Sequence, residues 1–239
     1  MAMAPPSRRQ QPVITAWAIH TLTASGAVLA LLALLAVEQS QWRLALAWLA
    51  ASLVVDGIDG PLARWAGVTT KLPRIDGAIL DLVVDYLTYV FVPAILMYRA
   101  GLLPDAWALP GMAAILLSSL YTFARTDMKT EDNYFRGFPA VWNVVIFYLF
   151  VLRPDPRIAA AVVAAFAVLT FAPIHFVHPV RVRRFQPWLL TAAVVWGISS
   201  VALLLPALSP VARTAALAIS LAGAAVLLGI GLLRTLRGR

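Results

Sequence analysis

Four aspartates lie in a short part of this sequence at spacings that favour a common site. Asp56 and Asp59 are three residues apart, and Asp81 and Asp85 are four apart. Because residues at i, i+3 and i+4 share one face of a helix, each pair would present both carboxylates in one direction. Hard oxygen ligands without a nearby His or Cys suit Mg²⁺, Mn²⁺ or Ca²⁺ rather than zinc. Four carboxylates can hold two divalent ions, and two such ions can clamp a phosphoryl group during displacement.

Small and cationic residues flank these acids. Gly60 and Gly77 remove side-chain bulk where a flat or anionic ligand must approach the backbone. Arg64 follows Gly60 by one helical turn and offers a forked contact to phosphate. Asp76 stands at the expected start of the helix that carries the second acidic pair, so we predict that it caps this helix.

The composition shows what kind of element must position these residues. The chain has 239 residues, of which 62% are hydrophobic and 13% charged, with no cysteine and a formal net charge of +8. A soluble domain typically has about 25% charged and 45–50% apolar residues. These values exclude a disordered chain, a disulfide scaffold, a thiolate metal site and an ordinary soluble enzyme. The sequence therefore predicts an integral membrane protein.

Eight apolar stretches approach the length of about 20 residues that a membrane-spanning helix needs. We predict an all-α polytopic bundle in one domain, residues 1–239, of which residues 1–12 form a short cytoplasmic N-terminal segment. The first stretch is longer than the apolar core of a cleavable signal peptide, so we expect it to remain as a span. The fifth is the shortest, and the loop before it could carry helical structure of its own. The predicted spans are 13–36, 42–64, 75–99, 107–126, 138–152, 157–176, 187–205 and 211–233.

The basic residues predict the orientation, because Lys and Arg gather on cytoplasmic loops. With eight spans both termini lie on one side, and that side carries 14 of the 19 basic residues. The net positive charge therefore needs no nucleic-acid partner. The termini and the loops after the second, fourth and sixth spans are therefore expected to face the cytoplasm. The 14 residues are Arg8, Arg9, Arg64, Lys71, Arg74, Arg125, Lys129, Arg136, Arg181, Arg183, Arg184, Arg234, Arg237 and Arg239.

Two antiparallel spans joined on the cytoplasmic side carry the four aspartates at similar depths. Each carboxylate inside a span costs roughly 2.5–3.5 kcal/mol on insertion scales, so four together indicate a functional cluster. An ion pathway also uses such clusters, which keeps a divalent-cation transporter as an alternative. Arg64, Lys71 and Arg74 at the cytoplasmic mouth favour a phosphate-bearing ligand instead.

The motif itself resembles the signature of the CDP-alcohol phosphotransferases. It reads Asp56-Gly-Ile-Asp59-Gly60-Pro-Leu-Ala63-Arg64, then twelve residues, then Gly77-Ala-Ile-Leu-Asp81-Leu-Val-Val-Asp85. The gap of twelve is longer than in most of the family and is similar to the bacterial phosphatidylcholine synthase branch. The stretches 85–93 and 136–143 also resemble that branch.

The resemblance implies transfer of a phosphatidyl group from CDP-diacylglycerol to choline, with release of CMP. It implies Mn²⁺ or Mg²⁺, as two ions, held by the four aspartates, and it makes Asp85 and Asp81 catalytic, with Asp85 as general base. Membrane lipids are further partners, and a homodimer is left open. The residues implied for CDP-diacylglycerol are Gly60, Ala63, Arg64 and Gly77.

Choline is a quaternary ammonium, so aromatic faces are expected to bind it. Aromatic residues near span ends also form the ordinary interfacial belt, which is the competing interpretation for each. Another acceptor, such as glycerol phosphate, inositol phosphate or serine, stays open, because Arg125, Lys129 and Arg136 could bind an anionic alcohol. The candidate choline residues are Tyr89, Tyr121, Tyr134, Trp142 and Asn143.

Overall fold

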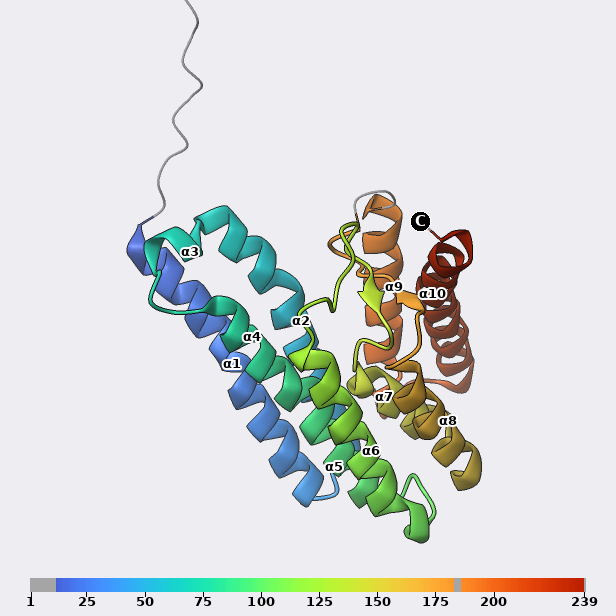
Figure 1. Cartoon of the computed structure of the whole chain (residues 1–239). Coiled ribbons are helices and arrows are strands. Elements are labelled where there is room, and N and C mark those ends of the chain that lie inside the picture. The colour runs from blue at the N-terminus through green and yellow to red at the C-terminus, as the bar shows by residue number, and fades with distance from the viewer. Residues whose placement is uncertain (1–11, 183–185, 239) are drawn as a thin grey trace, which may run out of the picture.

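The computed structural model describes residues 12–182 and 186–238, and it is a helical bundle (Figure 1). Within these residues, five helices are long and apolar enough to cross a membrane. Three shorter apolar helices, Trp142–Leu152, Pro156–Leu169 and Gln186–Ala202, bring the set to the predicted eight. The protein is therefore a polytopic helical membrane protein. Arg8, Arg9, Arg183, Arg184, Arg239 and the predicted segment 1–12 except Pro12 lie outside the described residues.

The first half of the chain forms the part of the bundle that holds the motif. Helices α1 (Val13–Glu38) and α2 (Trp42–Ala66) pack as an antiparallel pair. Gly67, with φ of 64°, ends α2 in the left-handed conformation that favours glycine. A short α3 (Val68–Lys71) then leads to the third span.

The third span is a continuous helix that changes from α-helical to π-helical and back to α-helical. It consists of α4 (Gly77–Asp85), a π-helical segment η1 (Tyr86–Phe91) and α5 (Val92–Arg99). Pro93 has no N–H to donate to the carbonyl of Tyr89, and this missing bond accounts for a local widening just before it. Such π segments are frequent at functional sites, and this one begins directly after Asp85.

The middle of the chain differs most from the predicted boundaries. Helix α6 (Asp105–Ala124) agrees with the fourth predicted span, but α7 (Trp142–Leu152) and α8 (Pro156–Leu169) are shorter than their predicted stretches. The predicted span 157–176 is wrong at its end, because residues 175 and 176 form strand β2 (His175–Phe176). Strand β2 pairs antiparallel with β1 (Phe135–Arg136) in the loop before α7, where we considered helical structure. Gly137 beside β1 has φ of 77° and packs against the Thr170 carbonyl, a position that a side chain could not share.

The last two helices, α9 (Gln186–Ala202) and α10 (Pro210–Arg237), form a pair against the other side of the bundle (Figure 1). The Tyr148 hydroxyl on α7 lies 2.7 Å from the Ser220 hydroxyl on α10 and accepts a 2.9 Å hydrogen bond from the Trp196 indole on α9. Gly223 packs on Trp196, and Gly231 packs on the backbone of β2, so both glycines serve internal packing. The described chain begins and ends at the same end of the bundle.

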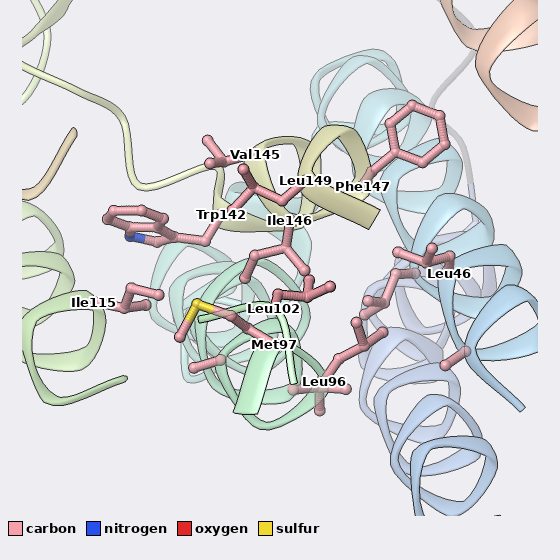
Figure 2. Packing of buried hydrophobic residues seen from close by; sticks show 14 of the residues in the cluster. Leu46, Leu96, Met97, Leu102, Ile115, Trp142, Val145, Ile146, Phe147 and Leu149 are labelled. Carbon is pink, nitrogen blue, oxygen red and sulfur yellow. The ribbon is translucent and has the colours of Figure 1, made fainter. Parts of the chain in front are cut away.

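The main apolar core lies between α7 and the helices around it. Figure 2 shows Trp142, Ile146 and Leu149 of α7 facing Leu96 and Met97 of α5. Trp142 is fully buried, and its indole nitrogen donates to the Ser119 hydroxyl at 2.8 Å. This packing fixes α5 and, through it, the position of α4 and its acids.

Candidate active site

Three of the four motif aspartates converge between α2 and α4. Asp56, Asp81 and Asp85 each offer a carboxylate oxygen, and these oxygens lie within 4.8 Å of one another. All three side chains are half-buried. The Tyr89 hydroxyl on η1 donates a 2.5 Å hydrogen bond to Asp56 and so connects the π segment to the cluster.

The fourth aspartate has a different partner. Asp59 is buried, and its carboxylate accepts a 2.7 Å hydrogen bond from the Thr23 hydroxyl on α1. It remains close enough to Asp56 and Asp81 to repel their charges. The structure thus places Asp59 beside the group of three rather than within it.

Local sequence explains how the two acidic helices are held. The Asp76 side chain accepts hydrogen bonds from the backbone N–H groups of Ala78 and Ile79, which confirms the predicted cap of α4. Pro61 lies inside α2 and leaves the carbonyl of Gly57 without its helical donor. Both features fall within the motif, one turn or less from an aspartate.

Cationic side chains border the acidic cluster above Gly60. A Cβ atom at Gly60 would lie 3.3 Å from Nη1 of Arg64 and 4.0 Å from Nη2 of Arg181, so both guanidinium groups cover this glycine. Lys129 is close enough to interact with Asp56, Asp81 and Asp85. None of these three cations is in an ion pair within 4.0 Å across the described residues. Together they form a surface suited to a multiply charged anion.

A small hairpin carries Lys129 to this position. The backbones of Lys129 and Phe135 pair across the turn, and the Lys129 ammonium lies 5.0 Å from the centre of the Phe135 ring. His178, which follows β2, stacks on the same ring at 5.3 Å. Burial, with the nearby charge of Arg181, lowers the pKa of Lys129.

We call Arg64, Lys129 and Arg181 the cationic rim. His178 lies beside this rim and is itself uncharged at neutral pH. Burial, followed by the charges of Lys129, Arg181 and Arg64, lowers the pKa of His178 to about 3. At neutral pH its imidazole therefore adds no charge and serves as a flat surface beside Phe135. From the sequence we considered Lys129 only for an anionic acceptor and Arg181 only for the orientation, because the β1–β2 pairing beside which they lie joins residues far apart in the chain.

The residues expected to bind choline are dispersed. Tyr89 contacts the acidic cluster, but Tyr121 is half-exposed and packs on Phe171 at 4.8 Å. Tyr134 is buried and lies under the Arg234 guanidinium. Trp142 belongs to the core, as described above, and the Asn143 side chain accepts a hydrogen bond from the backbone of Val144.

Two of the cations considered for an anionic acceptor have a carboxylate partner. Arg125 donates two 2.9 Å hydrogen bonds to Asp127, and Arg136 lies 3.7 Å from the same carboxylate. Both line a cavity with residues 171–175. Lys129 is thus the member of that predicted trio that interacts with the acidic cluster.

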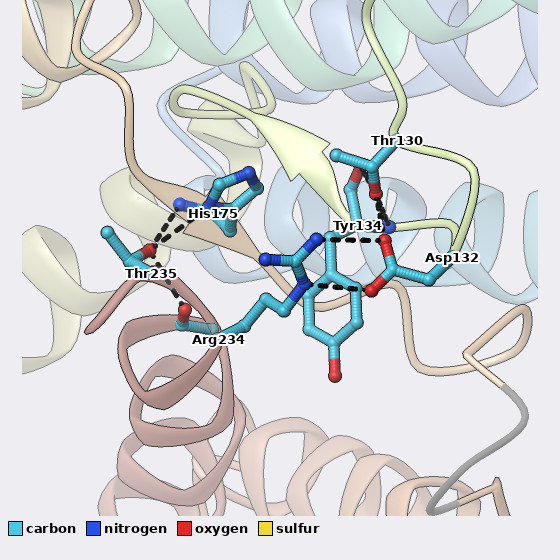
Figure 3. A network of polar contacts seen from close by, with 7 residues as sticks. Thr130, Asp132, Tyr134, His175, Arg234 and Thr235 are labelled. Carbon is cyan, nitrogen blue, oxygen red and sulfur yellow. Dashed lines mark hydrogen bonds and ion pairs between the residues drawn. The ribbon is translucent and has the colours of Figure 1, made fainter. Parts of the chain in front are cut away.

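A polar network ties the hairpin to α10 (Figure 3). Arg234 donates to Asp132 at 2.8 Å, and the Thr130 hydroxyl donates to Asp132 at 2.6 Å. The Thr235 hydroxyl accepts the backbone N–H of His175 at 2.8 Å. The end of α10 therefore fixes both strands whose loops carry Lys129 and His178.

The fold and the site define a class: a polytopic helical membrane protein with a cluster of carboxylates beside three cationic side chains. A family model for CDP-alcohol phosphatidyltransferase matches residues 15–173. The chain belongs to this family.

Curated relatives carry a more particular name. The chain is 50% identical over 185 residues to the phosphatidylcholine synthase of Pseudomonas aeruginosa, covering 77% of this chain and 78% of the relative. It is 45% identical to the phosphatidylcholine synthase of Mesorhizobium japonicum, covering 77% and 69%. It is 37% identical to that of Legionella pneumophila, covering 79% and 77%.

Proposed function

We propose that this protein is a phosphatidylcholine synthase that transfers the phosphatidyl group of CDP-diacylglycerol to choline and releases CMP. The observation that carries the proposal is the cluster of Asp56, Asp81 and Asp85 beside three cations, none of which has a carboxylate within 4.0 Å in the part of the chain that the structure describes. Identity of 50% to a phosphatidylcholine synthase supports choline as the acceptor. The same reaction accounts for every motif residue.

The donor diphosphate lies between the two charged surfaces in this proposal. Arg64, Lys129 and Arg181 bind its oxygens above Gly60, where the backbone leaves room for close approach. Gly60, Ala63, Arg64 and Gly77 hold the CMP half, as the family resemblance implies. This arrangement supplies positioning and charge neutralisation, which are the chief needs of phosphoryl transfer.

Proton and bond changes balance without another reactant. Asp85 accepts the proton of the choline hydroxyl, and the choline oxygen forms a bond to the phosphorus that bears diacylglycerol. The bond from that phosphorus to the CMP oxygen breaks, and CMP leaves with the electron pair. Asp81, one turn before Asp85, helps hold the reacting groups in line.

The donor set of the site fits Mg²⁺ or Mn²⁺, because it consists of carboxylate oxygens alone. We assign two ions to Asp56, Asp81 and Asp85 with Asp59 as the fourth ligand. Bound ions supply charge neutralisation to the diphosphate. The Thr23 hydroxyl on Asp59 orients that carboxylate, as a second ring of contacts commonly does.

Tyr89 is our candidate for the choline contact, because its aromatic ring lies beside the acidic cluster. An anionic acceptor is less well served, because Asp127 already engages Arg125 and Arg136. We also place the protein in the bacterial inner membrane as one domain, with both termini and the site facing the cytoplasm. The common end of the described chain and the basic loops support this orientation.

The direct test supplies purified protein with CDP-diacylglycerol, Mn²⁺ and one labelled alcohol at a time. We expect labelled lipid with choline and none with serine, glycerol phosphate or inositol phosphate. Product with another alcohol but not with choline would overturn the acceptor assignment. No CMP release with any alcohol, together with Mn²⁺ flux into liposomes, would favour the transporter instead.

A further inference from the structure

His20 lies on α1, which carries none of the motif residues, yet its side chain is buried against the motif. The residue is 7% exposed, and its Nε2 atom has no hydrogen-bond partner among residues 12–182 and 186–238. Buried polar side chains nearly always have a partner, and an orphaned one needs an explanation. A bound ligand could supply a hydrogen-bond partner for Nε2.

The position of the imidazole is defined by Gly77. A Cβ atom at Gly77 would lie 2.9 Å from Cε1 and 3.6 Å from Nδ1 of His20, so the ring fills the space that this glycine leaves. The Cε1–Nδ1 edge of the ring therefore faces the first residue of α4, and Nε2 lies more than 4 Å from that Cβ position. His20 and Gly77 therefore form one packing unit.

The same face of α1 meets the site a second time. Thr23 follows His20 by three residues, and its hydroxyl donates to Asp59 at 2.7 Å. Residues three apart share a helix face, so α1 presents two polar side chains toward α2 and α4. Helix α1 therefore contributes side chains to the site in addition to being one of the membrane-spanning helices.

We propose that Nε2 of His20 hydrogen-bonds the nucleoside half of the CDP donor, an inference that rests on the proposed function. The diphosphate is drawn to the cationic side chains above Gly60, where Arg64 and Arg181 lie. The ribose hydroxyls and the base offer both donors and acceptors, which match an imidazole nitrogen in either tautomer. His20 is therefore a donor-binding residue outside the motif.

A cavity lies one helical turn from His20 along α1. Its volume is about 380 Å³, and Trp17, one turn before His20 on α1, forms one wall. The opposite wall is the connection from α3 to α4, which contains the long gap of the motif. The lining residues are Trp17, Lys71, Leu72, Pro73, Arg74 and Ile75.

The test compares two ligands on the full protein in detergent with Mn²⁺ present. Calorimetric binding of CMP reports the nucleoside contact, and binding of inorganic pyrophosphate reports the cationic rim and the acids. His20→Phe keeps a ring against Gly77 but removes both nitrogens. We expect it to weaken CMP about tenfold, as the loss of one ordinary hydrogen bond would, and to leave pyrophosphate binding unchanged. His20→Gln, which retains a polar end, should recover part of the CMP affinity.

Several results would overturn the proposal. Unchanged CMP affinity in His20→Phe, or an equal loss for CMP and pyrophosphate, would make His20 a packing residue only. Should His20→Phe fail to fold, ¹⁵N-histidine NMR of the wild-type protein decides, since the chain has three histidines. The Nε2 signal of His20, assigned by substituting the other two, should shift with CMP and not with pyrophosphate; no shift with CMP contradicts the proposal. If the wild-type protein makes phosphatidylcholine but its His20 does not respond to CMP, the His20 contact is wrong and the proposed function stands. If the wild-type protein binds no CMP, both the His20 contact and the proposed function are contradicted.

Discussion

Tyr89 has two chemical groups that the proposed reaction uses differently. Its hydroxyl donates to Asp56, and its ring is buried beside the acidic cluster. The hydroxyl orients a carboxylate, whereas the ring face can attract a quaternary ammonium. Substitutions can separate these contributions.

We expect Tyr89→Phe to keep the KM for choline and to raise the Mn²⁺ concentration needed for half-maximal activity. Tyr89→Leu should in addition raise the KM for choline by about tenfold, the value of one aromatic–cation contact. Steady-state assays with choline and Mn²⁺ varied in turn measure both effects. An equal choline KM in the Phe and Leu variants would remove Tyr89 from the acceptor site.

The lowered pKa of His178 should make the free energy of unfolding depend on pH. Burial and neighbouring cations lower the pKa of this imidazole to about 3, against about 6.5 in an unfolded chain. Between these values the unfolded state binds a proton that the folded state does not, so the free energy of unfolding falls as pH falls from 6.5 toward 3. The stability due to this group is fully present above pH 6.5.

His178→Phe retains a ring to stack on Phe135 and cannot be protonated. We therefore expect its melting temperature in detergent to fall less than that of wild type between pH 7 and pH 4.5. The other titrating groups are common to both proteins, so the difference isolates His178. Equal losses in the two proteins would show that this imidazole accepts a proton without cost.

At the scale of elements, the hairpin before α7 depends on α10 for its position. Arg234 pairs with Asp132 at the turn, and Thr235 binds the backbone of β2. A single exposed ion pair contributes little to stability, but this one belongs to a network that holds the segment carrying Lys129. Its loss should therefore affect function more than folding.

We expect Arg234→Gln to lower kcat/KM for CDP-diacylglycerol several-fold with little change in melting temperature. The exchanged double variant Asp132→Arg with Arg234→Asp should recover much of the loss, because it restores an opposite pair. Kinetics of the three proteins beside wild type test this. If the double variant folds but does not recover kcat/KM, the position of Lys129 does not depend on the ion pair between Arg234 and Asp132.

Sequence periodicity predicted these elements unevenly. Long apolar runs such as 13–36 and 42–64 were placed well, because hydropathy over 20 residues records the membrane directly. The end of α8 was misplaced because the apolar run continues beyond the helix, while its last two residues, 175 and 176, pair as a strand with residues 136 and 135. Such a pairing depends on residues distant in the chain, which no local pattern reveals.

The site, like the fold, was predicted where it depends on local spacing and missed where it depends on residues distant in the chain. The spacing of the aspartates indicated one helix face for each pair, and three of them do converge. The contact of Asp59 with Thr23 and the rim residues Lys129 and Arg181 come from other elements. Their contribution follows from packing between spans rather than from spacing within one.

At the scale of the whole molecule, the scarcity of charge is what makes the acidic cluster informative. The chain has 11 acidic residues, and four of them lie in the motif between two spans. The described chain begins and ends at one end of the bundle, and the cavity beside Trp17 lies near the start of α1, so in our proposal a water-soluble acceptor and a membrane-held donor can meet there. In the proposed reaction these acids promote transfer to choline.

The most direct measurement is choline-dependent release of CMP from CDP-diacylglycerol by wild type, Asp85→Asn and Asp105→Asn. Asp105 is an exposed acid in the first turn of α6 and serves as the matched control. We predict one CMP for each phosphatidylcholine formed by wild type and by Asp105→Asn, and a loss of at least a hundredfold in a folded Asp85→Asn, in the range of general-base catalysis. Substantial choline-dependent turnover by Asp85→Asn, or CMP release by wild type that does not depend on choline, would contradict the account.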